Sequence, residues 1–80
     1  MKHYIVLCPY KVEGEPEVEI IGVRHSYEEA KALYDETIKD IKIDAEEWEM
    51  EVVADDRYYF EAIGDNWHPS YYMKLFIVEA

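Results

Sequence analysis

The residues in this sequence that could do chemistry are above all its 19 aspartates and glutamates. Seven of them crowd the segment 44–56, where no Lys or Arg occurs, and from Glu47 to Glu51 they alternate with apolar residues. Alternate residues of an extended strand lie about 6.5 to 7 Å apart on one face. This repeat is comparable to the spacing of phosphates along a nucleic-acid strand. A row of such carboxylates could therefore mimic the negative charges of a nucleic acid. Four more acids lie in an earlier predicted hairpin: Glu13, Glu15, Glu17 and Glu19.

The alternative for these acids is a solvated face. Charges of this kind keep a small protein soluble and protect the edges of a sheet from pairing with other chains. The pattern alone leaves both interpretations open.

Catalytic and metal-binding patterns are weak. Cys8 lies in the apolar run 3–8, where a thiol is usually a small buried hydrophobe and not an activated thiolate. The three histidines form no close pair, and neither a calcium loop nor a glycine-rich phosphate loop occurs. Glu51 and Glu61 could perform acid–base chemistry, but nothing in the sequence supplies a pocket for them. We therefore predict that the protein is not an enzyme and that it has no metal or cofactor site.

The formal net charge of −11 restricts the partners. It makes contact with DNA, RNA or an anionic membrane unfavourable, and it favours the basic groove of a protein that itself binds nucleic acid. No apolar run is long enough to span a bilayer, and the single cysteine cannot form an internal disulfide. We expect a soluble protein of a reducing compartment, the cytoplasm, which contacts neither nucleic acid nor membrane directly.

Aromatic residues supply a second set of candidate contacts. Trp67 lies in the loop 64–70, where it can protrude as an interface anchor or fold back onto the core. Tyrosines come in adjacent pairs at 58–59 and 71–72 on predicted strands, so one member of each pair must point away from the helix-covered face. Such an aromatic surface is either a partner or homodimer interface or an ordinary sheet surface with its hydroxyls in water.

The elements that must position these residues follow from periodicity. Ser26 and Glu29 have the spacing of a capping box, and an apolar stripe at three- and four-residue intervals predicts a helix over 27–41. Gly22 interrupts the second strand and indicates a bulge or bend. The sequence thus predicts one α+β domain spanning residues 1–80, in the order ββαβββ, with one amphipathic helix packed on one face of an antiparallel sheet. The predicted strands are 3–8, 17–20, 47–52, 58–63 and 71–78.

The hairpin after the helix has a predicted register. A three-residue loop, Asp55 to Arg57, keeps its apolar residues on one face. It sets Val52 opposite Phe60 and Met50 opposite Ala62. It also sets Glu51 opposite Glu61, a like-charge pair that destabilises a sheet and that proteins tolerate where function demands it.

Small size, high acidity and the lack of a catalytic motif resemble the composition of phage- or mobile-element-encoded inhibitors, including anti-CRISPR and DNA-mimic proteins. This resemblance favours a non-enzymatic inhibitor that blocks a basic, nucleic-acid-binding protein. The alternative is a small accessory domain that self-associates through its aromatic sheet face. The predicted partner-binding residues are Glu47, Glu49, Glu51, Asp55, Asp56, Glu61 and Trp67.

Overall fold

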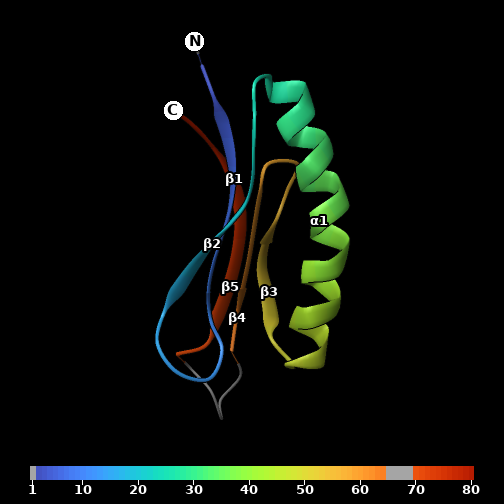
Figure 1. The fold of residues 1–80 in the computed structure, drawn as a ribbon. Helices are drawn as coiled ribbons and strands as arrows, with labels where there is room; N and C mark the ends of the chain where they lie inside the picture. The colour runs from blue at the N-terminus through green and yellow to red at the C-terminus, as the bar shows by residue number, and fades with distance from the viewer. Residues whose placement is uncertain (1, 65–69) are drawn as a thin grey trace.

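The computed structural model describes residues 2–64 and 70–80 (Figure 1). Its strands form one antiparallel sheet in the order β2-β1-β5-β4-β3, and the helix packs along one face of that sheet (Figure 1). The predicted α+β class, the element order and the packing of one helix on one face are confirmed. The elements are β1 (Tyr4–Lys11), β2 (Glu17–Arg24), α1 (Tyr27–Glu47), β3 (Glu51–Asp55), β4 (Tyr59–Ile63) and β5 (Tyr72–Glu79).

Helix α1 begins where the sequence predicts. The Ser26 hydroxyl oxygen accepts a hydrogen bond from the backbone N–H of Glu29 at 3.2 Å, and it donates one to the Glu29 carboxylate at 3.1 Å. The cap thus satisfies a backbone N–H that has no partner inside the helix. Two acids in the first turn add a favourable interaction with the positive end of the helix dipole.

The end of α1 differs from the prediction, because the helix continues to Glu47 and not to residue 41. Ala45 continues the apolar stripe and is buried against the sheet. Glu49 then takes a left-handed conformation with φ of 55°, while the N–H of Met50 donates to the Ala45 carbonyl at 2.9 Å. This is a Schellman-type end in which glutamate occupies the position usually held by glycine. The predicted strand at 47–52 therefore begins only at Glu51.

Strand β1 is central, as its continuous apolar run indicates, and it pairs with β2 and β5. The register of β1 against β2 shifts after Val6, so Ile21 is an extra residue and the predicted bulge is confirmed. A Cβ atom on Gly22 would lie 2.6 Å from Cδ2 of Leu33. The glycine therefore allows α1 to lie close to β2.

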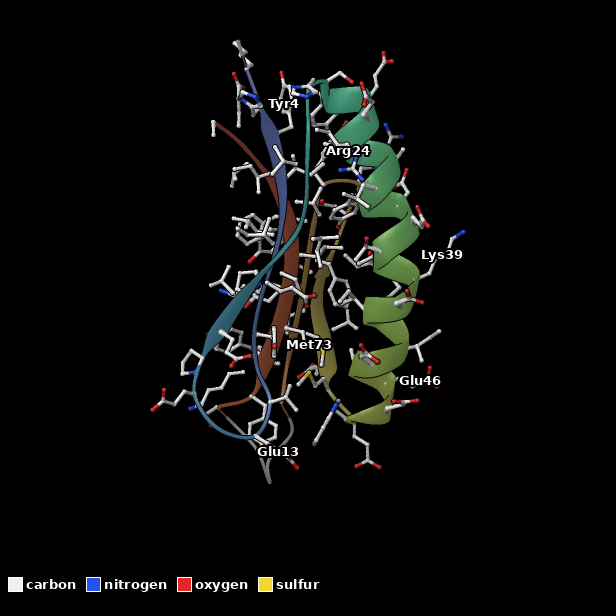
Figure 2. The ribbon with its side chains drawn as sticks, viewed as in Figure 1. Tyr4, Glu13, Arg24, Lys39, Glu46 and Met73 are labelled. Carbon is white, nitrogen blue, oxygen red and sulfur yellow. The ribbon has the colours of Figure 1, made fainter. Side chains whose placement is uncertain are left out.

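The core lies between α1 and the facing side of the sheet. Tyr34 of the helix and Phe60 and Leu75 of the strands are among its largest fully buried side chains. Figure 2 shows Met73 between the two layers, whereas Lys39 and Glu46 of α1 point away from the sheet. Within the described residues, no helix covers the opposite side of the sheet (Figure 1).

The register of β3 against β4 corrects the prediction for this hairpin. The connecting loop is 56–58, one residue later than predicted. Three predicted pairs are wrong: Glu51–Glu61, Val52–Phe60 and Met50–Ala62. The observed pairs are Glu51–Ile63, Val52–Ala62, Ala54–Glu61 and Asp55–Phe60.

Local hydrogen bonds and a bulge explain this register. The Asp56 carboxylate accepts the backbone N–H groups of Tyr58 and Tyr59, both at 2.8 Å, which closes a tight turn at the hairpin tip. Val53 is left unpaired at a bulge, and Met50 belongs to the end of the helix. The hairpin therefore needs no like-charge pair to align its faces.

Candidate functional site

Only two of the acids predicted to share a sheet face do so: by register, Glu51 and Glu61 lie on the same side of the sheet. Glu47 is the last residue of α1, and Glu49 lies in the left-handed turn that follows. Glu51 is the first residue of β3. The alternation across 47–51 is therefore wrong as a strand pattern, because a helix end occupies the first half of it.

The remaining predicted acids are engaged within the chain. Oδ2 of Asp55 lies 2.9 Å from Nζ of Lys42, and Asp56 accepts the hydrogen bonds of the hairpin turn. The Glu61 carboxylate accepts a hydrogen bond from the Tyr59 hydroxyl at 2.8 Å. Trp67, the last predicted contact, lies outside the described residues. The described members of the predicted partner-binding set therefore lie in three places: the end of α1, the tip of the β3–β4 hairpin and the side of the sheet that α1 leaves uncovered.

A different set of carboxylates forms a continuous row on α1, which we call the acidic stripe. Its members are seven, four, four and three residues apart, so they project within one narrow sector of the helix. All five side chains are exposed, and the three lysines of α1 fall outside this sector. The acidic stripe consists of Glu29, Glu36, Asp40, Asp44 and Glu47.

The acidic stripe borders two separate pockets between α1 and the sheet at its β2 edge, which we together call the groove. At one end, Glu29 and Glu36 line a shallow depression together with Arg24 of β2. At the other end, Asp44 lines a deeper pocket together with Glu19 of β2. Each pocket thus has at least one carboxylate of the acidic stripe on its helix side, and the deeper pocket also has a carboxylate of the sheet.

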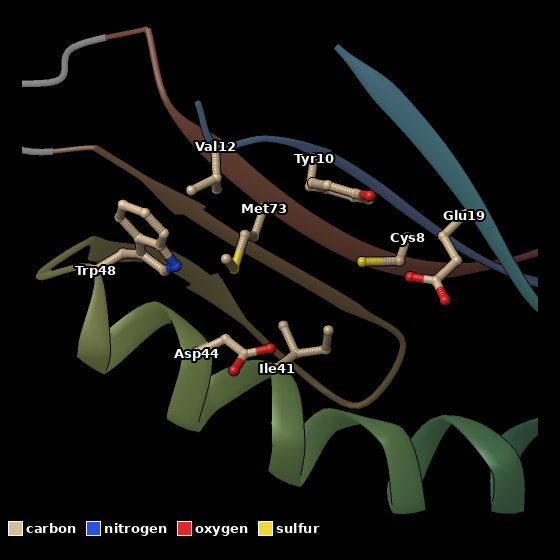
Figure 3. A pocket seen from close by; sticks show the side chains of 8 residues that line it. All are labelled: Cys8, Tyr10, Val12, Glu19, Ile41, Asp44, Trp48 and Met73. Atoms are coloured by element: carbon tan, nitrogen blue, oxygen red, sulfur yellow. The ribbon is translucent and has the colours of Figure 1, made fainter. Parts of the chain in front are cut away.

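The deeper pocket has a volume of about 260 Å³ and is smaller than most small-molecule sites. Figure 3 shows the carboxylates of Glu19 and Asp44 on opposite sides of it, with Cys8 next to Glu19 and Ile41 next to Asp44. This arrangement suits the side chain of a lysine or arginine, whose alkyl part packs on apolar atoms while its charged end meets carboxylates. The lining residues are Cys8, Tyr10, Val12, Glu19, Ile41, Asp44, Trp48 and Met73.

Cys8 lies in this pocket as a neutral thiol. Burial raises its pKa to about 11, and the negative charges of Glu19 and Asp44 act in the same direction. A thiol becomes a nucleophile or a metal ligand as the thiolate, which this setting disfavours at neutral pH. Cys8 therefore contributes apolar surface to the pocket and is held in its protonated form at neutral pH.

The opposite flank of α1, next to β3, holds a more open depression of about 420 Å³. Its charges are largely paired, since Lys31 forms an ion pair with Asp35 and Lys42 forms one with Asp55. The hydroxyl of Tyr34 is buried at this flank and has no hydrogen-bond partner among the described residues. Burial, reinforced by nearby aspartates, raises the pKa of Tyr34 to about 12.

The described part of the chain has neither a metal-binding cluster nor a membrane-spanning helix. No group of three His, Cys, Asp or Glu residues there is arranged to hold a metal ion. Over the same residues, no helix has both the length and the apolar character needed to cross a membrane.

The side of the sheet that α1 leaves uncovered is strongly apolar. Val18 and Ile20 of β2 are each 63% exposed. Of the tyrosine pairs, Tyr59 and Tyr72 lie on this side by register, and Tyr59 stacks on Phe76 with ring centroids 6.0 Å apart. The expectation that one tyrosine of each pair points away from the helix is therefore confirmed.

Comparison of the chain with protein-family models, with curated proteins and with solved structures found no match. Any function of the chain must therefore be inferred from its own geometry and charge.

Proposed function

We propose that this protein is a non-enzymatic inhibitor that binds a basic, nucleic-acid-binding protein through the groove between α1 and β2. The observation that carries the proposal is the pocket in which Glu19 and Asp44 lie on opposite sides of an apolar floor. An arginine or lysine of the partner enters this pocket. The partner's nucleic-acid site is then occupied, and inhibition is stoichiometric.

The acidic stripe supports the same proposal. From Glu29 to Glu47 it extends about 27 Å along the helix axis, and its successive members Glu36, Asp40 and Asp44 are about 6 Å apart. A helix therefore supplies the regular row of negative charge that the sequence pattern had assigned to a strand. With a net charge of −11, the chain also attracts basic surfaces at long range.

The biological class proposed is that of phage- or mobile-element-encoded inhibitors, including the anti-CRISPR and DNA-mimic types. The support for this class is the composition: a small, acidic chain with an exposed row of carboxylates and no catalytic motif.

The test is capture of partners from extracts of the native cell or its host at low and moderate salt. The site variant is Glu19→Gln with Asp44→Asn, and the control is Glu28→Gln with Glu46→Gln, which removes the same charge from α1 outside the acidic stripe. We expect the site variant to weaken binding at least tenfold, because a desolvated charge-assisted contact is lost. The control should change affinity only about twofold, as exposed charges do.

Two results would contradict the proposal. One is equal loss of binding in the site variant and the control, which would mean that total charge alone matters. The other is a captured partner that binds its nucleic acid equally well with and without this protein.

A further inference from the structure

The side of the sheet that faces away from α1 is an apolar surface in its own right, which we call the open face. Residues directly opposite each other on neighbouring antiparallel strands share a face, so the register identifies its members. Its apolar residues occur on all five strands. They are Ile5, Leu7, Pro9, Val18, Ile20, Val23, Ala54, Tyr59, Ile63, Tyr72, Phe76 and Val78.

The open face differs from the rest of the molecule in charge. By register it holds two bases and two acids, so its formal charge is zero, while the other surfaces hold the chain's excess of acids. Glu61 and Lys74 lie directly opposite each other on β4 and β5, which pairs one acid with one base. The other two charged residues are Lys11 and Glu51.

The area of the open face is that of an interface. Five strands about 4.8 Å apart, each five to eight residues long at about 3.3 Å per residue, cover roughly 500 Å² in projection. Two such faces in contact would bury about 1,000 Å² or more, which is the size at which specific protein interfaces begin. A patch of this size is at the upper end of what a typical monomer exposes, and such patches are often functional.

We propose that the open face is covered by a second copy of this chain, in a two-fold symmetric, face-to-face dimer. The layers would be helix, sheet, sheet and helix, with the sheets about 10 Å apart as in a β-sandwich. The partner is a second copy because self-pairing through a neutral face brings no excess of like charge together. Every other approach of two copies would bring together surfaces of a chain with a net charge of −11.

The dimer also keeps the acidic helices apart. Each α1 lies on the outer side of its own sheet, so three layer spacings of about 10 Å separate the two helices by roughly 30 Å. That distance is several times the Debye length of about 8 Å at physiological salt. Both grooves between α1 and β2 stay accessible on the outside, so this inference is independent of the proposed function.

The test is the oligomeric state of the full chain, measured by analytical ultracentrifugation over a range of concentrations at physiological salt. The site variant is Ile20→Lys on the open face, and the control is Ile43→Lys on α1. Both isoleucines are largely exposed, at 63% and 55%, so neither substitution disturbs the core and both add the same charge. Circular dichroism verifies that both variants are folded.

We expect the wild-type chain and Ile43→Lys to sediment as dimers, and Ile20→Lys to dimerise at least tenfold more weakly, because it places a lysine inside the interface. A wild-type chain that stays monomeric at all concentrations overturns the proposal and leaves the open face to a different protein. Equal dimerisation of the two variants also overturns it, since the dimer would then use another surface.

Discussion

The two faces of the sheet have similar residues but different surroundings. On one face, Phe60 and Leu75 are completely buried beneath α1. On the other, Phe76 and Leu7 lie side by side across β5 and β1, and Ile20 next to them is 63% exposed. Central strands that are apolar on both faces are typical of sheets covered on both sides. The comparison teaches that this sheet is suited to a covering layer on each of its two faces. The described residues provide a layer for only one face.

The acidic residues follow the same division. They are concentrated on α1 and on the hairpin of β1 and β2, where water or a basic partner can reach them, and the open face carries no net charge. Electrostatic recognition and apolar association therefore use different surfaces. Each can be changed while the other is kept.

The largest expected effect is a difference in stability between two alanine variants, one of a phenylalanine on each face of the sheet. Phe60→Ala removes a fully buried ring and should lower the free energy of unfolding by about 3 to 5 kcal/mol, which is much of the stability of a small domain. Phe76→Ala removes a half-buried ring and should cost less in the monomer. The measurement is chemical denaturation at low and high protein concentration.

The concentration dependence sharpens this comparison. If the open face is covered in a dimer, Phe76→Ala should lose more stability relative to wild type at high concentration, whereas the loss in Phe60→Ala should be about constant. An equally large loss in both variants at low concentration would break the comparison, because the two faces would then be equally packed within one chain.

The next effect concerns Cys8, whose thiol lies on the covered face. Its pKa of about 11 in the folded protein exceeds the value of about 8.5 expected in the unfolded chain. Between these values the folded state holds more protons, so the stability contributed by the neutral thiol is present below pH 8.5 and is lost as the pH rises toward 11. The loss should be about 3 kcal/mol.

Chemical denaturation at pH 8 and at pH 11 measures this loss, and Cys8→Ala is the control. Tyrosines titrate in both proteins, so only the difference between their pH dependences reports on the thiol. Wild type should lose more stability than Cys8→Ala over this interval. Equal pH dependence would mean that water reaches the thiol and that the covered face is open at this point.

The sequence predicts the helix and the strands of the two faces better than it predicts where these elements end. Ser26 and Glu29 identify the start of α1, and the apolar run in β1 identifies a central strand. The end of α1 could not be predicted in the same way. Glu49 takes the left-handed conformation there, and this conformation is usually taken by glycine, which a sequence reader would look for at a helix end. The register of β3 depends in turn on that end and on the turn formed by Asp56.

The candidate site could not be predicted either, because its position depends on where α1 ends. Glu19 and Asp44 belong to acid-rich segments of the sequence, but they meet only because α1 continues past residue 41 and β2 lies at the sheet edge next to β1. One signal was available, since Glu36, Asp40 and Asp44 keep the four-residue spacing of a helix beyond its predicted end. The expected alternation from Glu47 obscured it.

The smallest expected effect is a difference in stability between two variants that each remove one tyrosine hydroxyl, one on each face of the sheet. The Tyr34 hydroxyl is buried on the covered side without a partner among the described residues, whereas the Tyr59 hydroxyl on the open face donates to Glu61 at 2.8 Å. Tyr34→Phe should leave the free energy of unfolding unchanged or raise it by up to about 1 kcal/mol, because it removes an unsatisfied polar group. Tyr59→Phe should lower it by about 1 kcal/mol.

Chemical denaturation of the two variants, each compared with wild type under the same conditions, measures both changes. The pair is matched because each variant loses one oxygen atom and keeps its ring. A clear loss of stability in Tyr34→Phe would show that this hydroxyl is hydrogen-bonded in solution. Water would then reach the Tyr34 hydroxyl on the covered face, and the two faces would differ less in their access to water than the packing implies.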